Sequence, residues 1–488
     1  MRTEPRSHSI GEDDNAMPVT IPNPTGSYPS ISALAEAFQD GSLTPSDVVQ
    51  AHLQRIEKLD STLGSFQAVY AEDALAAAGA ADEAIASGHR VGPFHGIPFA
   101  LKDIFEVESR VTTCGSWAMQ DRISLHSGPI VHRLIAAGGI LLGKTKTVEC
   151  ALGGWGTNQR MGTPLNPWDL SHPRVPGGSS AGSGVAVAAG LSVCATGTDT
   201  GGSVRLPAAF CGLTGLKTSK ACLPTAGIMP LSHSLDTPGP MTRSVMDTAL
   251  MLAVMQGCES WRIEYDLEHH TGLFNKFLDG VSGLKFGVLD DYERKNCSVD
   301  ILASYDDAVN RLLALGAEIE VFTTPERYVD LAAANGAITI YEGYGYHKDF
   351  YDDPQAPMDE DVRKRMLTGR GLTPASQVER LAAQLQCQTR FDIALKGFDA
   401  LLTPTITDTA PLLSEIDQDI SPGHFTRPFN YLDMCALSMP TLPAADQLPT
   451  SLQIVARAGQ ESLVLRIGAA LERTFEVPAY PDFSALLD

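Results

Sequence analysis

The 488-residue sequence lacks the features that mark membrane and secreted proteins. No window approaches the roughly 20 uninterrupted apolar residues that a membrane span needs, because Asp, Glu or Gly breaks each Ala-rich stretch. The start, MRTEPRSHSIGEDDNAMPVT, has no apolar core typical of a secretion signal. The nine cysteines are scattered singly without a CxxC pair, which favours reduced thiols over a disulfide framework or a zinc site. We therefore expect a soluble, cytoplasmic protein.

Basic residues are also scarce: 36 Lys and Arg stand against 58 Asp and Glu, for a formal net charge of −22. Such a surface repels a phosphate backbone, so nucleic acid is not an expected partner. The sequence contains no HExxH and no strand-to-helix GxGxxG, and GLTGLKTS lacks the G-K-[ST] order of a phosphate-binding loop. We expect no metal and no nucleotide cofactor.

Apolar periodicity predicts alternating helices and strands. Helices are expected over 31–41, 44–60, 71–88 and 300–315, strands near 96–105, 285–290, 317–322 and 398–405, and a mainly helical stretch over 325–400. Alternation of this kind indicates an α/β fold with a largely parallel sheet. No segment reads as a linker, so we predict one large domain over 31–488 after a flexible tail over 1–30.

Two segments dense in glycine and serine, PGGSSAGSG (176–184) and TGTDTGGSVRLP (196–207), carry the main chemical signal. Glycines let several backbone N–H groups turn toward one point, where they can stabilise an oxyanion beside a serine. We predict Ser203 as the nucleophile, with an oxyanion hole from the amides of Thr200, Gly201, Gly202 and Ser203 itself. Turn-forming segments without chemistry are the alternative.

Lys102 lies at the end of the apolar run GIPFALKD (96–103), where an ammonium would be poorly solvated. Burial lowers a lysine pKa and so produces the neutral amine that a base needs. The alternative is a side chain that reaches water at its tip.

The three segments together resemble the amidase signature family, in which a lysine and two serines form a Ser-Ser-Lys triad. The matching positions are Lys102 as base, Ser179 as relay and Ser203 as nucleophile, with 203 − 179 = 24 residues between the serines. The resemblance continues through FCGLTGLKTS (210–219), SLDTPGPMTRSV (234–245), FDALLTPT (398–405) and SLQIVA (451–456). It implies a mixed central β-sheet covered by helices on both faces, with a core at about 96–245 and a more variable helical pocket region at about 325–400.

The resemblance also implies an activity and further site residues. The expected reaction is hydrolysis of linear amides through an acyl-Ser203 intermediate, with a small-molecule substrate, and homodimers are common in the family. A cis peptide bond is expected between Gly178 and Ser179, a supporting hydrogen bond from Ser180, and a brace between Asp199 and Arg205. The expected acyl pocket comprises Leu152, Gly153, Gly154 and Trp155. Further candidates for the pocket wall are Phe425, Phe429, Tyr431, Cys435, Tyr341, Tyr344 and Tyr346.

Several alternatives remain open. Residues 178–182 also satisfy G-x-S-x-G, the nucleophile elbow of α/β-hydrolase esterases, with Ser180 as nucleophile, His233 as base, and Asp199 or Asp236. An A-type amidotransferase subunit would act on glutamine with a partner. Against it, Leu206 replaces the usual Gln, and ITIYEGYGYHKDF (338–350) replaces a characteristic segment. A cysteine nucleophile and a family member that has lost catalysis are the remaining alternatives.

Overall fold

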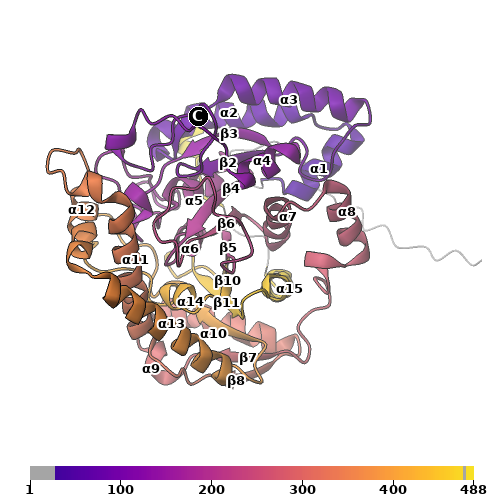
Figure 1. Cartoon of the computed structure of the whole chain (residues 1–488). Helices are drawn as coiled ribbons and strands as arrows, with labels where there is room; N and C mark the ends of the chain where they lie inside the picture. Colours follow the sequence, from indigo (N-terminus) through magenta and orange to yellow (C-terminus); the bar gives the residue numbers. More distant parts are fainter. Residues whose placement is uncertain (1–27, 476–479, 488) are drawn as a thin grey trace, which may run out of the picture.

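The computed structural model describes residues 28–475 and 480–487, and an 11-stranded sheet runs through its centre (Figure 1). The strand order is β1-β3-β2-β4-β6-β5-β10-β11-β9-β7-β8. The strands are β1 (Phe66–Val69), β2 (Pro98–Lys102), β3 (Ile140–Thr145), β4 (Cys194–Asp199), β5 (Thr214–Lys217), β6 (Thr237–Thr242), β7 (Lys285–Val288), β8 (Glu318–Val321), β9 (Ala400–Pro404), β10 (Cys435–Pro440) and β11 (Ser451–Ala456).

The sheet is mixed, as the family resemblance implied. Strand β2 pairs in parallel with β3 and β4, and β7 pairs in parallel with β8 and β9. The ladders between them, from β4 through β6, β5, β10 and β11 to β9, are antiparallel. The prediction of a largely parallel sheet is therefore wrong. Strand β6, TPGPMT, carries Pro238 and Pro240 in the middle of the sheet, where proline normally argues against a strand.

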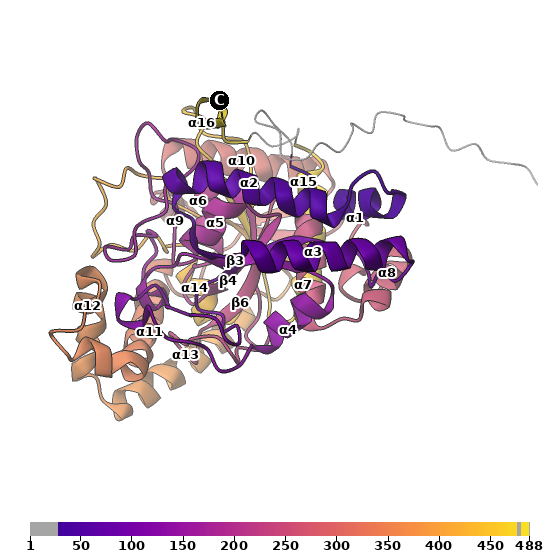
Figure 2. The same ribbon diagram turned by 90° about the horizontal axis from the view of Figure 1, so that it is seen from above.

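Helices cover both faces of the sheet. They are α1 (Ile31–Asp40), α2 (Pro45–Leu63), α3 (Ala71–Ala86), α4 (Pro129–Ala136), α5 (Ala181–Ala188), α6 (Arg205–Cys211), α7 (Val245–Gln256), α8 (Ser260–His269), α9 (Asp291–Arg294), α10 (Val299–Ala314), α11 (Tyr328–Tyr351), α12 (Glu360–Leu367), α13 (Pro374–Ala394), α14 (Arg427–Tyr431), α15 (Glu461–Glu472) and α16 (Ser484–Leu487). Figure 1 shows α5 and α6 on one side of the strands and α7 and α15 on the other. Seen from above, α2 and α3 lie side by side (Figure 2).

Local sequence signals explain several of these boundaries. Thr44 caps α2 through a reciprocal capping box with Asp47, and Pro45 occupies the first turn, so this helix begins where the sequence predicted. The helices and strands expected near 31–41, 71–88, 285–290, 300–315, 317–322 and 398–405 are confirmed within a few residues. The segment 325–400 is mainly helical, as predicted, and forms α11 to α13 along one side of the sheet (Figure 1).

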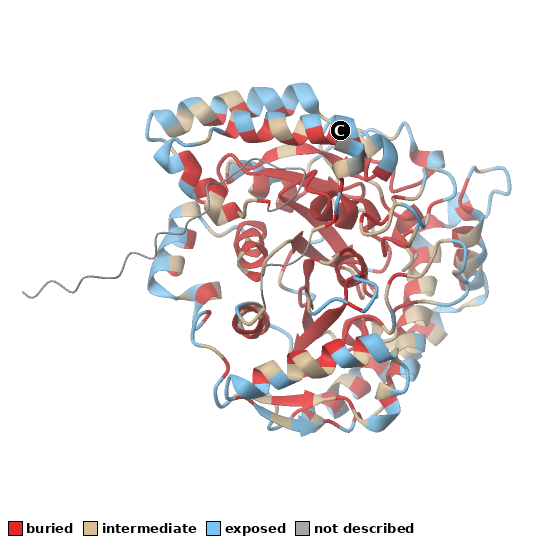
Figure 3. Ribbon diagram, turned by 180° about the vertical axis from the view of Figure 1, so that it is seen from behind, coloured by how far each residue is buried: buried red, intermediate tan, exposed pale blue. Residues whose placement is uncertain are grey.

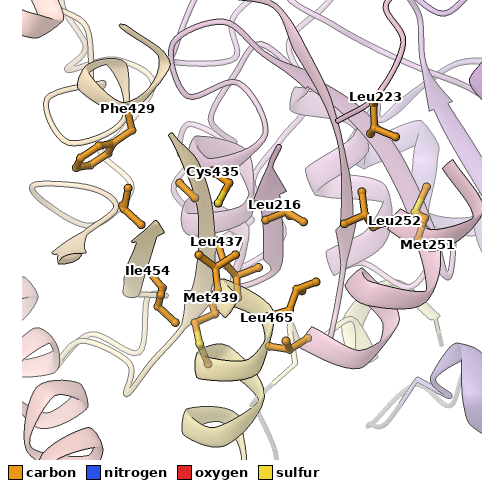
Figure 4. Close-up of a cluster of buried hydrophobic side chains, with 14 of the residues drawn as sticks. Leu216, Leu223, Met251, Leu252, Phe429, Cys435, Leu437, Met439, Ile454 and Leu465 are labelled. Carbon is orange, nitrogen blue, oxygen red and sulfur yellow. The ribbon is translucent and has the colours of Figure 1, made fainter. Parts of the chain in front are cut away.

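The hydrophobic core occupies the sheet and the inner faces of the helices, while the outer faces of the peripheral helices are exposed (Figure 3). Figure 4 shows part of it, where Leu216 of β5, Leu437 of β10 and Ile454 of β11 gather with Met251 of α7 and Leu465 of α15. This packing fixes the central strands against α7 and α15, and it gives the site a rigid support.

The N-terminal tail, the cysteines and the membrane prediction can also be compared with the described residues. Of the tail predicted over 1–30, residues 1–27 lie outside the described residues, and the buried Tyr28 contacts Arg55. All nine cysteines are unpaired. Among the described helices, none combines the length and the apolar character needed to cross a membrane.

Candidate active site

Lys102 is the last residue of β2 and is completely buried. Its Nζ lies 2.8 Å from Ser179 Oγ and 2.8 Å from Thr198 Oγ1. Burial lowers the pKa of Lys102 to about 7, although the more distant carboxylates of Asp236 and Asp199 act to raise it. A substantial fraction of this amine is therefore neutral near pH 7 and can accept a proton.

Ser179 follows a cis peptide bond from Gly178, so the expectation drawn from the family is confirmed. The amide of Gly178 donates to Gly154 O at 2.8 Å. A Cβ on Gly178 would lie 2.6 Å from Gly153 O, so only glycine fits this close approach. On the other side, Ser179 O accepts a hydrogen bond from Val148 N at 3.1 Å. The backbone thus fixes the hydroxyl of Ser179 against Lys102.

Ser203 lies in the turn that joins β4 to α6, and only 8% of it is exposed. Its carbonyl accepts a hydrogen bond from Ser180 N at 3.4 Å, which ties this turn to the segment that carries Ser179. Gly202 has a φ of +128°, and a Cβ there would lie 2.3 Å from Thr426 Oγ1. The glycine is therefore required for the shape of the turn that presents Ser203.

The predicted oxyanion donors are not equivalent. The amide of Gly202 donates to Asp199 Oδ1 at 2.7 Å and is therefore not available to an oxyanion. This removes Gly202 from the four predicted donors. The carbonyl of Thr200 accepts from Asn335 Nδ2 at 3.1 Å. The carbonyl of Thr200 and the amide of Gly201 belong to the same peptide group, and in a trans peptide they point in opposite directions. The amide of Gly201 is therefore directed away from Asn335.

Asp199 and Arg205 form a fully buried ion pair behind the turn, which confirms the expected brace. Asp199 Oδ1 and Oδ2 lie 2.9 and 3.0 Å from Arg205 Nη2 and Nε. Burial acts to raise the pKa of Asp199, but the charge and hydrogen bonds of Arg205 outweigh it and hold that pKa below its usual range. Arg205 also donates to Gln453 and Asn430 at 2.6 Å each. The pair anchors the turn to β11 and α14.

Ser180 is buried, and its hydroxyl meets the backbone of Thr198, accepting from the amide at 3.4 Å. His233, the base required by the esterase alternative, is exposed and forms no hydrogen bond with Ser180 in the described part of the chain. No strand runs into Ser180, which precedes α5. The structure therefore does not form a nucleophile elbow at Ser180.

The four predicted pocket residues separate into two groups. Leu152 and Gly154 line a cavity of about 230 Å³. Trp155 instead donates from its indole to the carbonyls of Asp417 and Ile420 at 3.1 and 2.8 Å, so it holds the loop that borders the cavity. Gly153 packs beside Val148, where a Cβ would lie 2.8 Å from a methyl group.

The remaining candidates for the pocket wall also fall into two groups. Phe425, Phe429, Tyr431 and Cys435 are buried core residues. Tyr341, Tyr344 and Tyr346 line a second cavity, of about 450 Å³, together with His233 and Glu342. Helix α11 borders both cavities.

Sequence reasoning missed three residues at this site. Thr198 contacts the lysine, and its signal was its place in β4 one residue before Asp199. Arg365 and Arg427 line the smaller cavity. Arg427 stands alone as a cation within the otherwise uncharged run FTRPFNYL, which could have singled it out.

The fold and the sequence agree on the class of protein. The amidase family model matches residues 47–465, and the chain belongs to this amidase family. Several relatives are named as the A subunit of glutamyl-tRNA(Gln) amidotransferase. One, from Dehalococcoides mccartyi, is 33% identical and covers 91% of this chain and 96% of the relative. Another, from Methylobacillus flagellatus, is 34% identical and covers 90% and 95%.

Comparison with solved structures supports the same family assignment. A peptide amidase from Stenotrophomonas maltophilia has a TM-score of 0.81 at 27% identity and covers 93% of this chain and 98% of its own. A protein from a vestigial complex, described as revealing the origins of an s-triazine catabolic enzyme, has a TM-score of 0.84 at 29% identity and covers 93% and 100%. The chain is thus similar to proteins whose names point to different substrates.

Proposed function

We propose that this chain hydrolyses a carboxylic amide bond through an acyl intermediate on Ser203. The observation that carries the proposal is the contact between Lys102 Nζ and Ser179 Oγ at 2.8 Å in a fully buried setting. A lysine with hydroxyl partners and a pKa near 7 has the properties of a general base.

The proposed reaction moves one proton along three groups. As Ser203 Oγ bonds to the amide carbon, its proton passes to Ser179, and the proton of Ser179 passes to neutral Lys102. The negative charge that develops on the carbonyl oxygen is stabilised by backbone N–H groups, for which Thr200, Gly201 and Ser203 are the candidates. The C–N bond then breaks, and the proton returns through Ser179 to the leaving amine. Water attacks the ester by the same route and releases the carboxylate.

A second candidate function follows from the relatives. They are amidotransferase A subunits at 32–34% identity over nine-tenths of both chains, so glutamine hydrolysis alongside partner subunits is a specific alternative. Against it, ITIYEGYGYHKDF (338–350) lies on α11, and this helix lines both cavities. The segment that departs from the pattern expected of an A subunit therefore lies on the helix that borders both cavities.

Two measurements test the proposal. Phenylmethanesulfonyl fluoride should add to Ser203, as identified by peptide mass mapping, and the adduct should be absent from Ser203→Ala. An adduct on Ser180 would support the esterase alternative and contradict the proposal.

The isolated chain should then hydrolyse members of a panel of aliphatic amides, aryl amides, ureas and hydrazides. Hydrolysis of glutamine alone, and only with the partner subunits of an amidotransferase, would instead establish the second candidate.

A further inference from the structure

Two arginines, Arg365 and Arg427, line the cavity of about 230 Å³, which lies beside the turn that carries Ser203. Arg427 opens α14, directly over the turn: a Cβ on Gly201 would lie 3.1 Å from Arg427 Cγ and 3.6 Å from Nε. On its far side the guanidinium reaches α11, where a Cβ on Gly336 would lie 3.3 Å from Nη1. Glycine inside a helix costs about 1 kcal/mol relative to alanine. In α11, Gly336 leaves room for the guanidinium of Arg427.

Arg427 has no counterion among the residues that the structure describes. Within residues 28–475 and 480–487, its guanidinium forms no hydrogen bond or ion pair, although it carries up to five donors. Burial, and then the charge of Arg365, lower the pKa of Arg427 to about 10. The guanidinium is partly buried and lines the cavity, so its donors can bind an acceptor that enters there.

Arg365, the second arginine, does not neutralise this charge but adds to it. Its Nε and Nη2 donate to the carbonyls of Asp361 and Leu152 at 3.1 and 2.9 Å, so neutral backbone dipoles hold it in place. Among the described residues that line the cavity, the one carboxylate is Asp419, which is exposed and lies 2.7 Å from Lys364 Nζ. A chain with a net charge of −22 thus places two guanidinium groups in one cavity without a dedicated acidic partner from its described residues.

We infer that this cavity binds a carboxylate on the acyl half of the substrate, with Arg427 as the main contact. The inference rests on the proposed function, because it places the anion beside the turn that carries Ser203. Guanidinium matches carboxylate geometry and can bind it through two parallel hydrogen bonds. The acyl half is favoured because Leu152 and Gly154, two residues of the expected acyl pocket, line the same cavity. Gly154 O also accepts a hydrogen bond from the amide of Gly178, next to Ser179. The substrate class is therefore a monoamide of a short dicarboxylic acid.

The test measures binding to Ser203→Ala by titration calorimetry, so it does not depend on turnover. Primary amides with a terminal carboxylate and two to four methylene groups, such as glutaramate, are compared with matched neutral amides such as pentanamide. At least one carboxylate should bind about 10- to 100-fold more tightly than its neutral partner, the range expected for a hydrogen bond to a charged group. Arg427→Met should abolish the difference, Arg427→Lys should restore part of it, and Arg262→Met, an exposed arginine on α8, should leave it unchanged.

The outcomes separate the two hypotheses. Equal binding of the charged and neutral amides, or a preference that survives Arg427→Met, would overturn the inference. Tighter binding of N-butanoylglycine, whose carboxylate lies on the amine half, would overturn the assignment to the acyl half. None of these results depends on whether Ser203 is labelled by the sulfonyl fluoride. Failure of that labelling would count against the proposed function, whatever the carboxylate preference.

Discussion

Two buried lysines on neighbouring strands differ in the charge of the groups that they contact. Lys102 ends β2 and contacts the hydroxyls of Ser179 and Thr198. Lys144, on the adjacent strand β3, places its Nζ 2.7 Å from Asp103 Oδ1, and both side chains are almost fully buried. Lys144 Nζ also donates to Thr112 Oγ1 at 3.0 Å, so both lysines contact hydroxyls and only Lys144 is paired with a carboxylate.

The difference shows that burial alone does not make a base. Burial lowers the pKa of both lysines, but at Lys144 the adjacent Asp103 charge opposes that effect and stabilises the ammonium form. At Lys102 no carboxylate of the described chain is in contact, and the pKa falls to about 7. We therefore assign Lys144 a structural role and Lys102 the chemical one, and four predictions test this division.

The largest effect is expected from Lys102→Met. Removing the base should lower kcat/KM at pH 7 by about 1000-fold, within the range of general acid–base catalysis. The measurement uses the best amide of the substrate panel, with circular dichroism to show that the variant is folded. Lys144→Met should keep activity within a few fold at temperatures where it is folded. If the two variants lose activity equally, the division of roles is wrong.

Lys144→Met should instead lower the free energy of unfolding by about 3–5 kcal/mol, because it leaves Asp103 buried without its cation. Urea unfolding followed by circular dichroism measures the change. The double variant Asp103→Asn, Lys144→Met should recover part of the loss, since no buried charge remains. A loss below about 1 kcal/mol, typical of an exposed pair, would contradict this account.

Lys102→Met should be more stable than the native chain at pH 7. The folded pKa of about 7 lies below the unfolded value of 10.5, so the unfolded chain binds more protons between these values. The cost of burying Lys102 is nearly complete at pH 7 and disappears above pH 10.5. It amounts to about 4 kcal/mol, and losing two hydrogen bonds leaves a net gain of about 2 kcal/mol. Urea unfolding at pH 7 and pH 10 should show the gain shrinking with pH, and an advantage that grows with pH would contradict the assigned pKa shift.

The sequence could predict those parts of the fold and site that depend on local patterns. Thr44 and Pro45 mark the start of α2, and the spacing of Lys102, Ser179 and Ser203 identified the family. The antiparallel centre of the sheet could not be predicted in the same way, because the prolines of β6 argue locally against a strand and only its neighbours impose one.

The missed residues of the site depend on contacts between distant segments. Arg427 reaches Gly201 across 427 − 201 = 226 residues, and no local pattern reveals such a contact. Trp155 lies in the predicted pocket segment, yet its indole is directed to the carbonyls of Asp417 and Ile420. Sequence position therefore indicated the right loop but not the direction of its side chain.

The smallest effect is expected from Thr198→Val, which tests whether hydroxyl contacts set the pKa of Lys102. Thr198 Oγ1 lies 2.8 Å from Lys102 Nζ, and such a hydrogen bond favours the ammonium more than the neutral amine. Its loss should lower the pKa of Lys102 further, by about one unit for a bond worth about 1.4 kcal/mol. The acid limb of the kcat/KM profile should therefore move to lower pH while the maximal rate stays within a few fold. Thr248→Val, which removes a buried hydroxyl on α7, is the matched control, and a limb that stays in place or moves to higher pH would show that Thr198 does not stabilise the charged lysine.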